Sequence, residues 1–212
     1  MFRCYWSVLV VIAAGCSVPS ISASDGSSWV MALATPRFDS ASQWYGWIEI
    51  QQRCRLSSFD MYQWIVRPGI GWRIGNGTSV WVGYAWIETY RPSYSGEHRL
   101  CQQMQWAVLP TLGARARIEE RFFGRGGELR LRGQLRMVVS VGSVPLILAN
   151  ELFVTAARWE RAIPIGYDQN RFQIGTMFHL PSHLQAEIGY MNIVLASGSP
   201  CHVITMALIY QP

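Results

Sequence analysis

Arginine and glutamate recur at every second position in two neighbouring stretches of the chain, and these side chains are the most capable of chemistry. In the first stretch, Arg115, Arg117, Glu119 and Arg121 all occupy odd-numbered positions. The second stretch, residues 128–136, repeats this pattern of alternation at even-numbered positions. We call the odd or even set of positions in a strand its parity. A guanidinium binds a carboxylate or another planar anion through two parallel hydrogen bonds. The pattern therefore predicts either an internal Arg/Glu ion-pair network or an anion-binding surface.

The element that positions these charges is a β-strand. Successive side chains of a strand point to opposite faces, so a period of two gives one charged face and one apolar face. Between the two stretches, residues 124–127 contain three glycines and form a turn signal. We expect a long hairpin, with Glu120 as an exception on the apolar face.

Similar stretches follow one another along nearly the whole chain, separated by residues typical of turns. No helical period persists beyond a few residues. The expected strands are 42–55, 60–73, 78–91, 97–109, 112–123, 128–140, 146–157, 168–180, 183–196 and 201–211. The fold class is therefore all-β, and ten antiparallel strands in up-and-down order are expected. Residues Trp29–Ala34 would add a strand and break the even count, so twelve strands are the alternative.

Composition indicates which face of these strands lies inside. The chain of 212 residues is 50% hydrophobic and 15% charged, whereas soluble domains carry about 25% charged residues. Strands of this length suit a bilayer crossing, which needs about 9–11 tilted residues. Aromatic residues lie near the expected strand ends, as in the interfacial girdles of outer-membrane barrels. We expect a transmembrane β-barrel with its charged face inside and outer-membrane lipid around it.

The first residues are typical of an export signal. Arg3 precedes an apolar stretch, and small residues ending at Ala23 suit signal peptidase. We expect a signal peptide over residues 1–23, one barrel domain over residues 24–212, and the bacterial outer membrane as the destination. Residues 13–16 resemble a lipoprotein signal, so acylation of Cys16 is the second interpretation.

The predicted lumen gathers most of the charged residues of the mature chain. A barrel of this size has an interior that side chains nearly fill, so opposite charges there should pair. A structural or binding role with an Arg/Glu-filled lumen is the first hypothesis. The alternatives are a narrow anion-selective pore and a soluble periplasmic barrel that binds a ligand, with a small anion as the expected solute. The expected lumen residues are Glu49, Arg53, Arg67, Arg73, Glu97, Arg99, Arg115, Arg117, Glu119, Arg121, Glu128, Arg130, Arg132, Arg136, Glu151, Arg171 and Glu187.

Other chemistries have little support. The chain has no Cys/His metal-ligand spacing and no GxSxG nucleophile elbow, so neither a cofactor nor an enzyme activity is expected. Its formal charge of +5 is alternated within strands instead of clustered, so nucleic acid is not an expected partner. Nothing in the sequence indicates an oligomeric state.

Cysteine positions suggest one covalent link. The mature chain keeps Cys54, Cys101 and Cys201. In a closed barrel of ten strands the first strand pairs with the last, which would place Cys54 and Cys201 at the same end. We expect a disulfide between them or, equally, free thiols, because disulfide geometry is narrow.

Several segments, taken in order, resemble one bacterial family, the domain of unknown function 2490. They are residues 65–71, 81–84, 97–103, 115–122, 129–132, 150–153, 168–171 and 187–192. Two residues depart from the family pattern: Cys101 stands where Trp is common, and Glu120 where Gln is common. The resemblance implies an outer-membrane β-barrel and implies no activity.

Overall fold

Every regular element in the described part of the protein is a β-strand. The computed structural model describes residues 26–39, 42–75, 77–90, 93–124, 126–159, 165–198 and 200–212. The signal peptide and the acylation site at Cys16 fall outside the described residues. The strands are β1 (Gly26–Ala34), β2 (Trp44–Arg55), β3 (Met61–Gly75), β4 (Thr78–Thr89), β5 (Ser95–Leu109), β6 (Leu112–Phe123), β7 (Gly126–Val141), β8 (Val144–Trp159), β9 (Gly166–Leu180), β10 (Leu184–Leu195) and β11 (Pro200–Tyr210).

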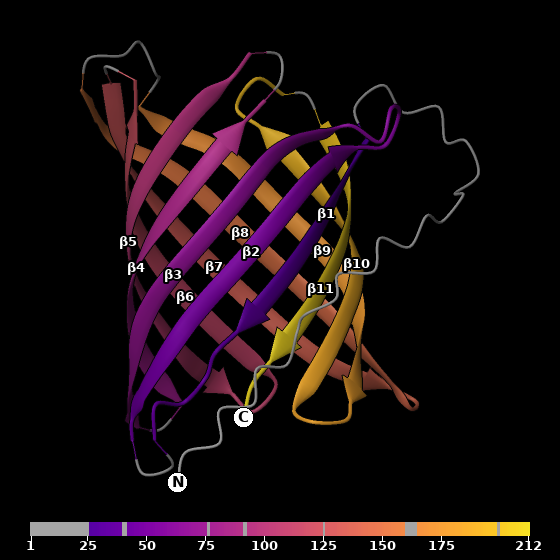
Figure 1. Ribbon diagram of the computed structural model, residues 1–212. Coiled ribbons are helices and arrows are strands. Elements are labelled where there is room, and N and C mark those ends of the chain that lie inside the picture. Colours follow the sequence, from indigo (N-terminus) through magenta and orange to yellow (C-terminus); the bar gives the residue numbers. More distant parts are fainter. Residues whose placement is uncertain are drawn as a thin grey trace, which may run out of the picture.

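These strands close into one barrel (Figure 1). From β2 to β11 each strand pairs antiparallel with the next one in the chain. β1 completes the circle, since it pairs antiparallel with β2 and parallel with β11. A closed barrel satisfies the backbone hydrogen-bonding groups of every strand and leaves no sheet edge.

The expected all-β barrel of about ten strands, with twelve as the alternative, is confirmed. The described residues form eleven strands, and one of the pairs is parallel. All ten expected strands are present, and the eleventh is β1, which contains Trp29–Ala34. The even count assumed that the closing pair is antiparallel. A closing pair that is parallel allows an odd number of strands. In β1, Trp29 is aligned with Thr205 of the parallel neighbour β11 and with Arg53 of the antiparallel neighbour β2.

The two ends of the barrel differ in their connections. The end that we call the turn end carries the β1–β2, β3–β4, β5–β6, β7–β8 and β9–β10 connections and the C-terminus (Figure 1). The opposite end, called the loop end, carries the β2–β3, β4–β5, β6–β7, β8–β9 and β10–β11 connections and the first residue of β1. The turns Pro110–Thr111 and Gly142–Ser143 consist of residues that favour such tight reversals.

The outer face of the barrel is apolar and exposed. Large side chains such as Ile70, Val82, Leu135 and Ile188 are 44%, 61%, 54% and 50% exposed. An apolar surface of this extent around a whole molecule is unusual for a protein in water. Among the described residues, no helix is long and apolar enough to cross a membrane.

Aromatic side chains mark both ends of this outer face. Trp44 and Trp72 stack on each other near the turn end, with ring centroids 5.5 Å apart. Phe122 and Trp159 lie near the loop end, with ring centroids 5.8 Å apart. Exposed aromatic rows at two levels are the arrangement expected where a protein meets the two interfaces of a bilayer.

Candidate functional site

The charged residues predicted for the lumen lie inside the barrel. Their side chains either line its cavity or are buried in ion pairs beside it. The strand period carries them inward, because each occupies the parity opposite to the exposed apolar residues of its strand. They are Glu49, Arg53, Arg67, Glu97, Arg99, Arg115, Arg117, Glu119, Arg121, Arg130, Arg132, Arg136, Glu151, Arg171 and Glu187.

Glu119 is the centre of the ion-pair network. Its side chain is 0% exposed, and its carboxylate lies 2.5 Å from Arg132 and 2.6 Å from Arg130. Arg117 and Arg99 approach the same carboxylate at 3.4 Å and 3.7 Å. One buried carboxylate thus neutralises part of the charge of four guanidiniums, which would otherwise repel one another.

Further carboxylates extend this network, among them Asp168, which lies 3.4 Å from Arg130. Glu97 accepts hydrogen bonds from Arg99 and Arg121, each with an N–O distance of 2.5 Å. Arg121 also bonds Glu128, which the charge pattern had placed on this face. At the other side Glu151 accepts from Arg115 and Arg132, both at 2.8 Å. Arg99 links Glu97 to Glu119, and Arg132 links Glu119 to Glu151. These three carboxylates therefore belong to one network over β5–β8.

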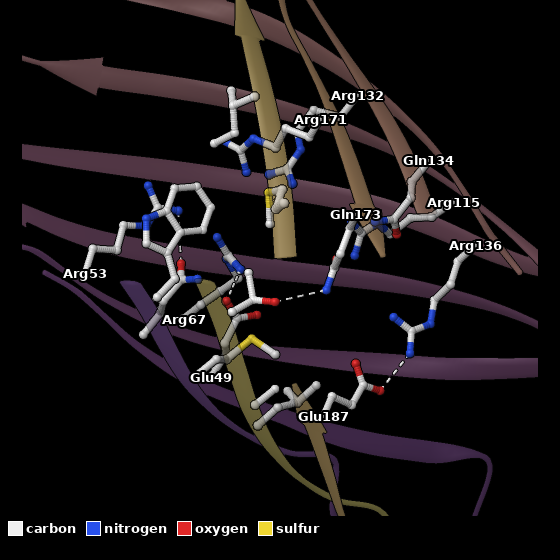
Figure 2. A pocket seen from close by; sticks show the side chains of 18 of the residues that line it. Glu49, Arg53, Arg67, Arg115, Arg132, Gln134, Arg136, Arg171, Gln173 and Glu187 are labelled. Carbon is white, nitrogen blue, oxygen red and sulfur yellow. Dashed lines mark hydrogen bonds and ion pairs between the residues drawn. The ribbon is translucent and has the colours of Figure 1, made fainter. Parts of the chain in front are cut away.

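Two ion pairs stand apart from that network. Glu49 on β2 accepts a hydrogen bond from Arg67 on β3 at 2.5 Å. Glu187 on β10 accepts from Arg136 on β7 at 2.7 Å, across the width of the barrel (Figure 2). Both carboxylates are buried. Each is held by one arginine. The first pair links two adjacent strands, the second joins two distant ones, and neither enlarges the network.

Two arginines of the main cavity, Arg53 and Arg171, have no carboxylate of the described residues within ion-pair distance. The predicted lumen residue Arg73 has none either, but it lines a second cavity near the turn end. Arg53 donates to Gln63 at 2.7 Å and to Gln51 at 3.0 Å, both neutral. Arg171 contacts aromatic rings, with its guanidinium carbon 4.3 Å from the centre of Phe153 and 5.0 Å from that of Trp29. The Nε atoms of both arginines are buried without a hydrogen-bond partner. Neither guanidinium forms an ion pair with a carboxylate of the described residues, although Arg171 is aligned across the strands with Glu151.

The wall opposite the network is apolar, which the sequence analysis did not predict. Trp29, Met191, Ile193 and Val203 form a buried cluster on the inner side of β1, β10 and β11, and Cys201 packs against it. Further along the same wall, Met31, Leu33, Met177, Ala207 and Ile209 line the lumen. The available signal was the scarcity of charge at the inward parity of β1, β10 and β11, where Glu187 is the one charged residue, in contrast to β5–β8.

Between the two walls lies a cavity of about 760 Å³ (Figure 2). Its lining extends from Leu195 and Cys201 near the loop end to Gln185 and Gln211 near the turn end. A second cavity of about 330 Å³ adjoins it at the turn end and shares Met31, Leu33 and Glu49 with it. The charged side chains therefore fill the half of the lumen along β5–β8 and leave the half along β9–β11 and β1 hollow.

Two glycines help to keep that half hollow. Gly175 on β9 and Gly189 on β10 are aligned with each other. A Cβ atom on either would lie 2.7 Å from a backbone oxygen of the adjacent strand. The close approach of the two strands thus requires glycine, and neither strand projects a side chain inward at these two positions.

The expected link between Cys54 and Cys201 loses its basis. β1 lies between β2 and β11, so these two cysteines are on strands that are not neighbours. Cys54 is a free thiol, and on β2 it is aligned with Ser28 of β1. The expectation depended on a direct contact between β2 and β11, which the inserted strand prevents.

Histidines lie outside the lumen. His98 and His202 each contact a tyrosine on the outer face, Tyr84 and Tyr190, with stacked rings 5.9 Å apart in both pairs. In the described part of the chain, no group of three or more His, Cys, Asp or Glu residues is placed to hold a metal ion. The lumen chemistry is therefore that of guanidinium groups, carboxylates and apolar side chains.

Comparisons with known proteins identify the family of the chain. Residues 26–200 match the family described as "Protein of unknown function (DUF2490)". An uncharacterized protein of Methylorubrum extorquens is 28% identical over 196 residues, which cover 87% of this chain and 85% of that protein. No solved structure matches. Since the family match spans β1 to the first residue of β11, the chain belongs to the DUF2490 family.

Proposed function

We propose that the protein is an outer-membrane β-barrel whose lumen binds small anions. The observation that carries the anion site is the pair of arginines, Arg53 and Arg171, that face the cavity without a carboxylate partner. Around the cavity, arginine outnumbers glutamate, so the lumen has a surplus of positive charge. A desolvated positive site of this kind attracts an anion, because unpaired charge in a confined lumen is costly.

The outer-membrane part of the proposal is supported by the exposed apolar face and its aromatic ends. An apolar belt around a closed barrel suits lipid better than water. The export signal expected over residues 1–23 supports the same destination. Membrane fractionation of the expressed protein, together with heat-modifiable migration on gels, tests it. A mature protein that stays soluble without detergent would contradict it and favour a soluble periplasmic binding barrel.

Anion binding is tested with radiolabelled sulfate. The barrel is placed in nanodiscs of zwitterionic lipid and dialysed to equilibrium, with empty nanodiscs as the blank. We expect the double variant Arg53→Gln/Arg171→Gln to weaken sulfate retention at least tenfold. Arg73→Gln is the matched control, because Arg73 also lies over an aromatic ring, 4.7 Å from the centre of Tyr45, but outside the main cavity. Equal retention by the wild type and the double variant would refute the site.

A narrow anion-conducting path is the second candidate. The observation that favours it is that the cavity lining reaches from Leu195 at the loop end to Gln211 at the turn end. Planar bilayer recordings under a salt gradient test it, since the sign of the reversal potential reports whether anions or cations carry the current. Anion-selective steps that disappear in Arg53→Gln/Arg171→Gln would support a pore. The absence of current, or a cation-selective current, would refute the pore and leave anion binding as the proposed function.

A further inference from the structure

We infer that the ligand of this lumen is a single-chain amphiphile with an anionic head, such as a carboxylate, sulfate or phosphate on an unbranched alkyl chain. This inference rests on the proposed function and narrows it. It comes from a juxtaposition: Arg53 and Arg171, which have no ion-pair partner among the described residues, lie where the charged half of the lumen meets the apolar wall. A compact inorganic anion would use only the arginines and leave the apolar wall of the cavity in contact with water.

The head-group position is set by Trp29. The guanidinium carbon of Arg53 lies 3.6 Å from the centre of its indole ring, and that of Arg171 lies 5.0 Å from it. Stacking on one ring holds both cations beside the apolar cluster, while their Nε atoms are buried without partners. An oxyanion there would receive the two-pronged hydrogen bonds that guanidinium groups offer.

The chain position is the wall between Trp29 and the turn end. Met31 and Leu33 follow Trp29 at the inward parity of β1, while Ala207 and Ile209 do so on β11. Four residues of a strand span about 13 Å, enough for a medium-length alkyl chain. Methionine is unbranched and polarizable, so it adapts to a flexible chain.

Next to this wall, the aligned Gly175 and Gly189 leave a trough. Strand β11 contributes Thr205 at the same level, aligned with Gly189. The cavity of about 760 Å³ falls within the roughly 300–1,000 Å³ typical of sites for one drug-sized ligand. The space thus suits one alkyl chain lying along the strands.

Two carboxylates lie along the proposed chain path, and each is paired with an arginine. Glu49, aligned with Leu33, is paired with Arg67. Glu187 is aligned with Ala207 on β11 and with Met177 on β9. It accepts hydrogen bonds from Arg136 at 2.7 Å and from Gln185 at 2.6 Å. Its charge is therefore drawn toward the opposite wall and does not repel an anionic amphiphile.

The test measures how affinity depends on chain length. Radiolabelled butanoate, hexanoate, octanoate and decanoate are dialysed against the protein in zwitterionic nanodiscs, with empty nanodiscs subtracted. Burial of each additional methylene should tighten binding up to about fourfold, and the gain should end once the chain fills the trough. Unlabelled decyl sulfate should displace bound decanoate, and decyltrimethylammonium, with the same chain and a cationic head, should not.

Variants separate the two parts of the site. Ala207→Trp, which fills the trough, should remove the dependence of affinity on chain length. Leu208→Trp is its matched control, because the neighbouring residue has the opposite parity and faces outward. Met31→Gln makes the wall polar with little change in volume and should weaken decanoate binding at least tenfold. It tests the same wall if Ala207→Trp does not fold.

The outcomes distinguish this inference from the proposed function. If butanoate and decanoate bind equally and both depend on Arg53 and Arg171, the amphiphile is wrong and the anion site stands. If decanoate binding survives Arg53→Gln/Arg171→Gln, the assigned head-group position is wrong. If no carboxylate or sulfate binds above the empty nanodiscs, both the inference and the anion site are refuted.

Discussion

Replacing Glu119 by glutamine tests whether the ion-pair network holds the barrel together. The carboxylate of Glu119 is fully buried and lies 2.5 Å and 2.6 Å from Arg132 and Arg130. In the variant, the amide NH₂ would face guanidinium donors, and the positive charge around it would lose its counter-charge. Charge-assisted hydrogen bonds contribute about 1.5–3 kcal/mol each, and breaking a buried pair costs about 3–5 kcal/mol. We expect Glu119→Gln to lower the free energy of unfolding by about 3–5 kcal/mol.

The adjacent residue supplies the control for that measurement. Glu120 has the opposite parity and forms no ion pair among those described, so Glu120→Gln makes the same chemical change on the outer face. Urea unfolding in detergent micelles, followed by tryptophan fluorescence, gives both free energies. The double variant Glu119→Gln/Arg130→Gln should recover part of the loss, because it also removes one of the uncompensated charges. A cost for Glu119→Gln within about 1 kcal/mol of that for Glu120→Gln would refute the structural role of the network.

Three other features give predictions of their own. Gly189→Ala should lower the yield of folded barrel, since its Cβ would lie 2.7 Å from a backbone oxygen; Gly133→Ala, with open space around its Cβ, should not, and equal yields on folding gels would contradict this. Cysteines placed at Val30 and Met206, which are aligned in the parallel β1·β11 pair, should cross-link on oxidation in a background free of other cysteines, whereas a barrel closed by β2 and β11 would leave them apart. Leu131→Arg, on the outer face near mid-barrel, should cost about 2–4 kcal/mol of unfolding free energy in a bilayer, and a negligible cost would indicate that this face contacts water.

Sequence alone predicts most of the fold because the charged face marks the strands. The alternation over Arg115–Arg121 and Glu128–Arg136 fixes both the strand type and the inward parity of β6 and β7. The stretch that forms β1 was left out of the ten strands because it would break the even count of an antiparallel barrel. A parallel closing pair has no sequence signature, so an even, antiparallel count was the natural expectation.

The partners within the lumen were beyond prediction for a different reason. Which arginines reach Glu119 depends on the register between strands and on the tilt that closes the barrel, and periodicity determines neither. The apolar wall could not be predicted either, because the expectation for a lumen is that its lining residues are polar. Met177, Met191 and Ile193 have inward parity, but they look like lipid-facing residues when composition is the only guide.

The parallel pairing of β1 with β11 has a topological consequence. Because both strands run from the loop end to the turn end, the start of the first strand at Gly26 and the finish of the last at Tyr210 lie on opposite ends of the barrel. In a barrel with an even number of antiparallel strands, both would emerge on the same side. If the turn end faces the periplasm, a tag before Gly26 would be displayed at the cell surface, while a tag after Tyr210 would stay inside. Assembly must then carry the leading segment of the chain across the bilayer, while the trailing segment never leaves the side on which it arrived.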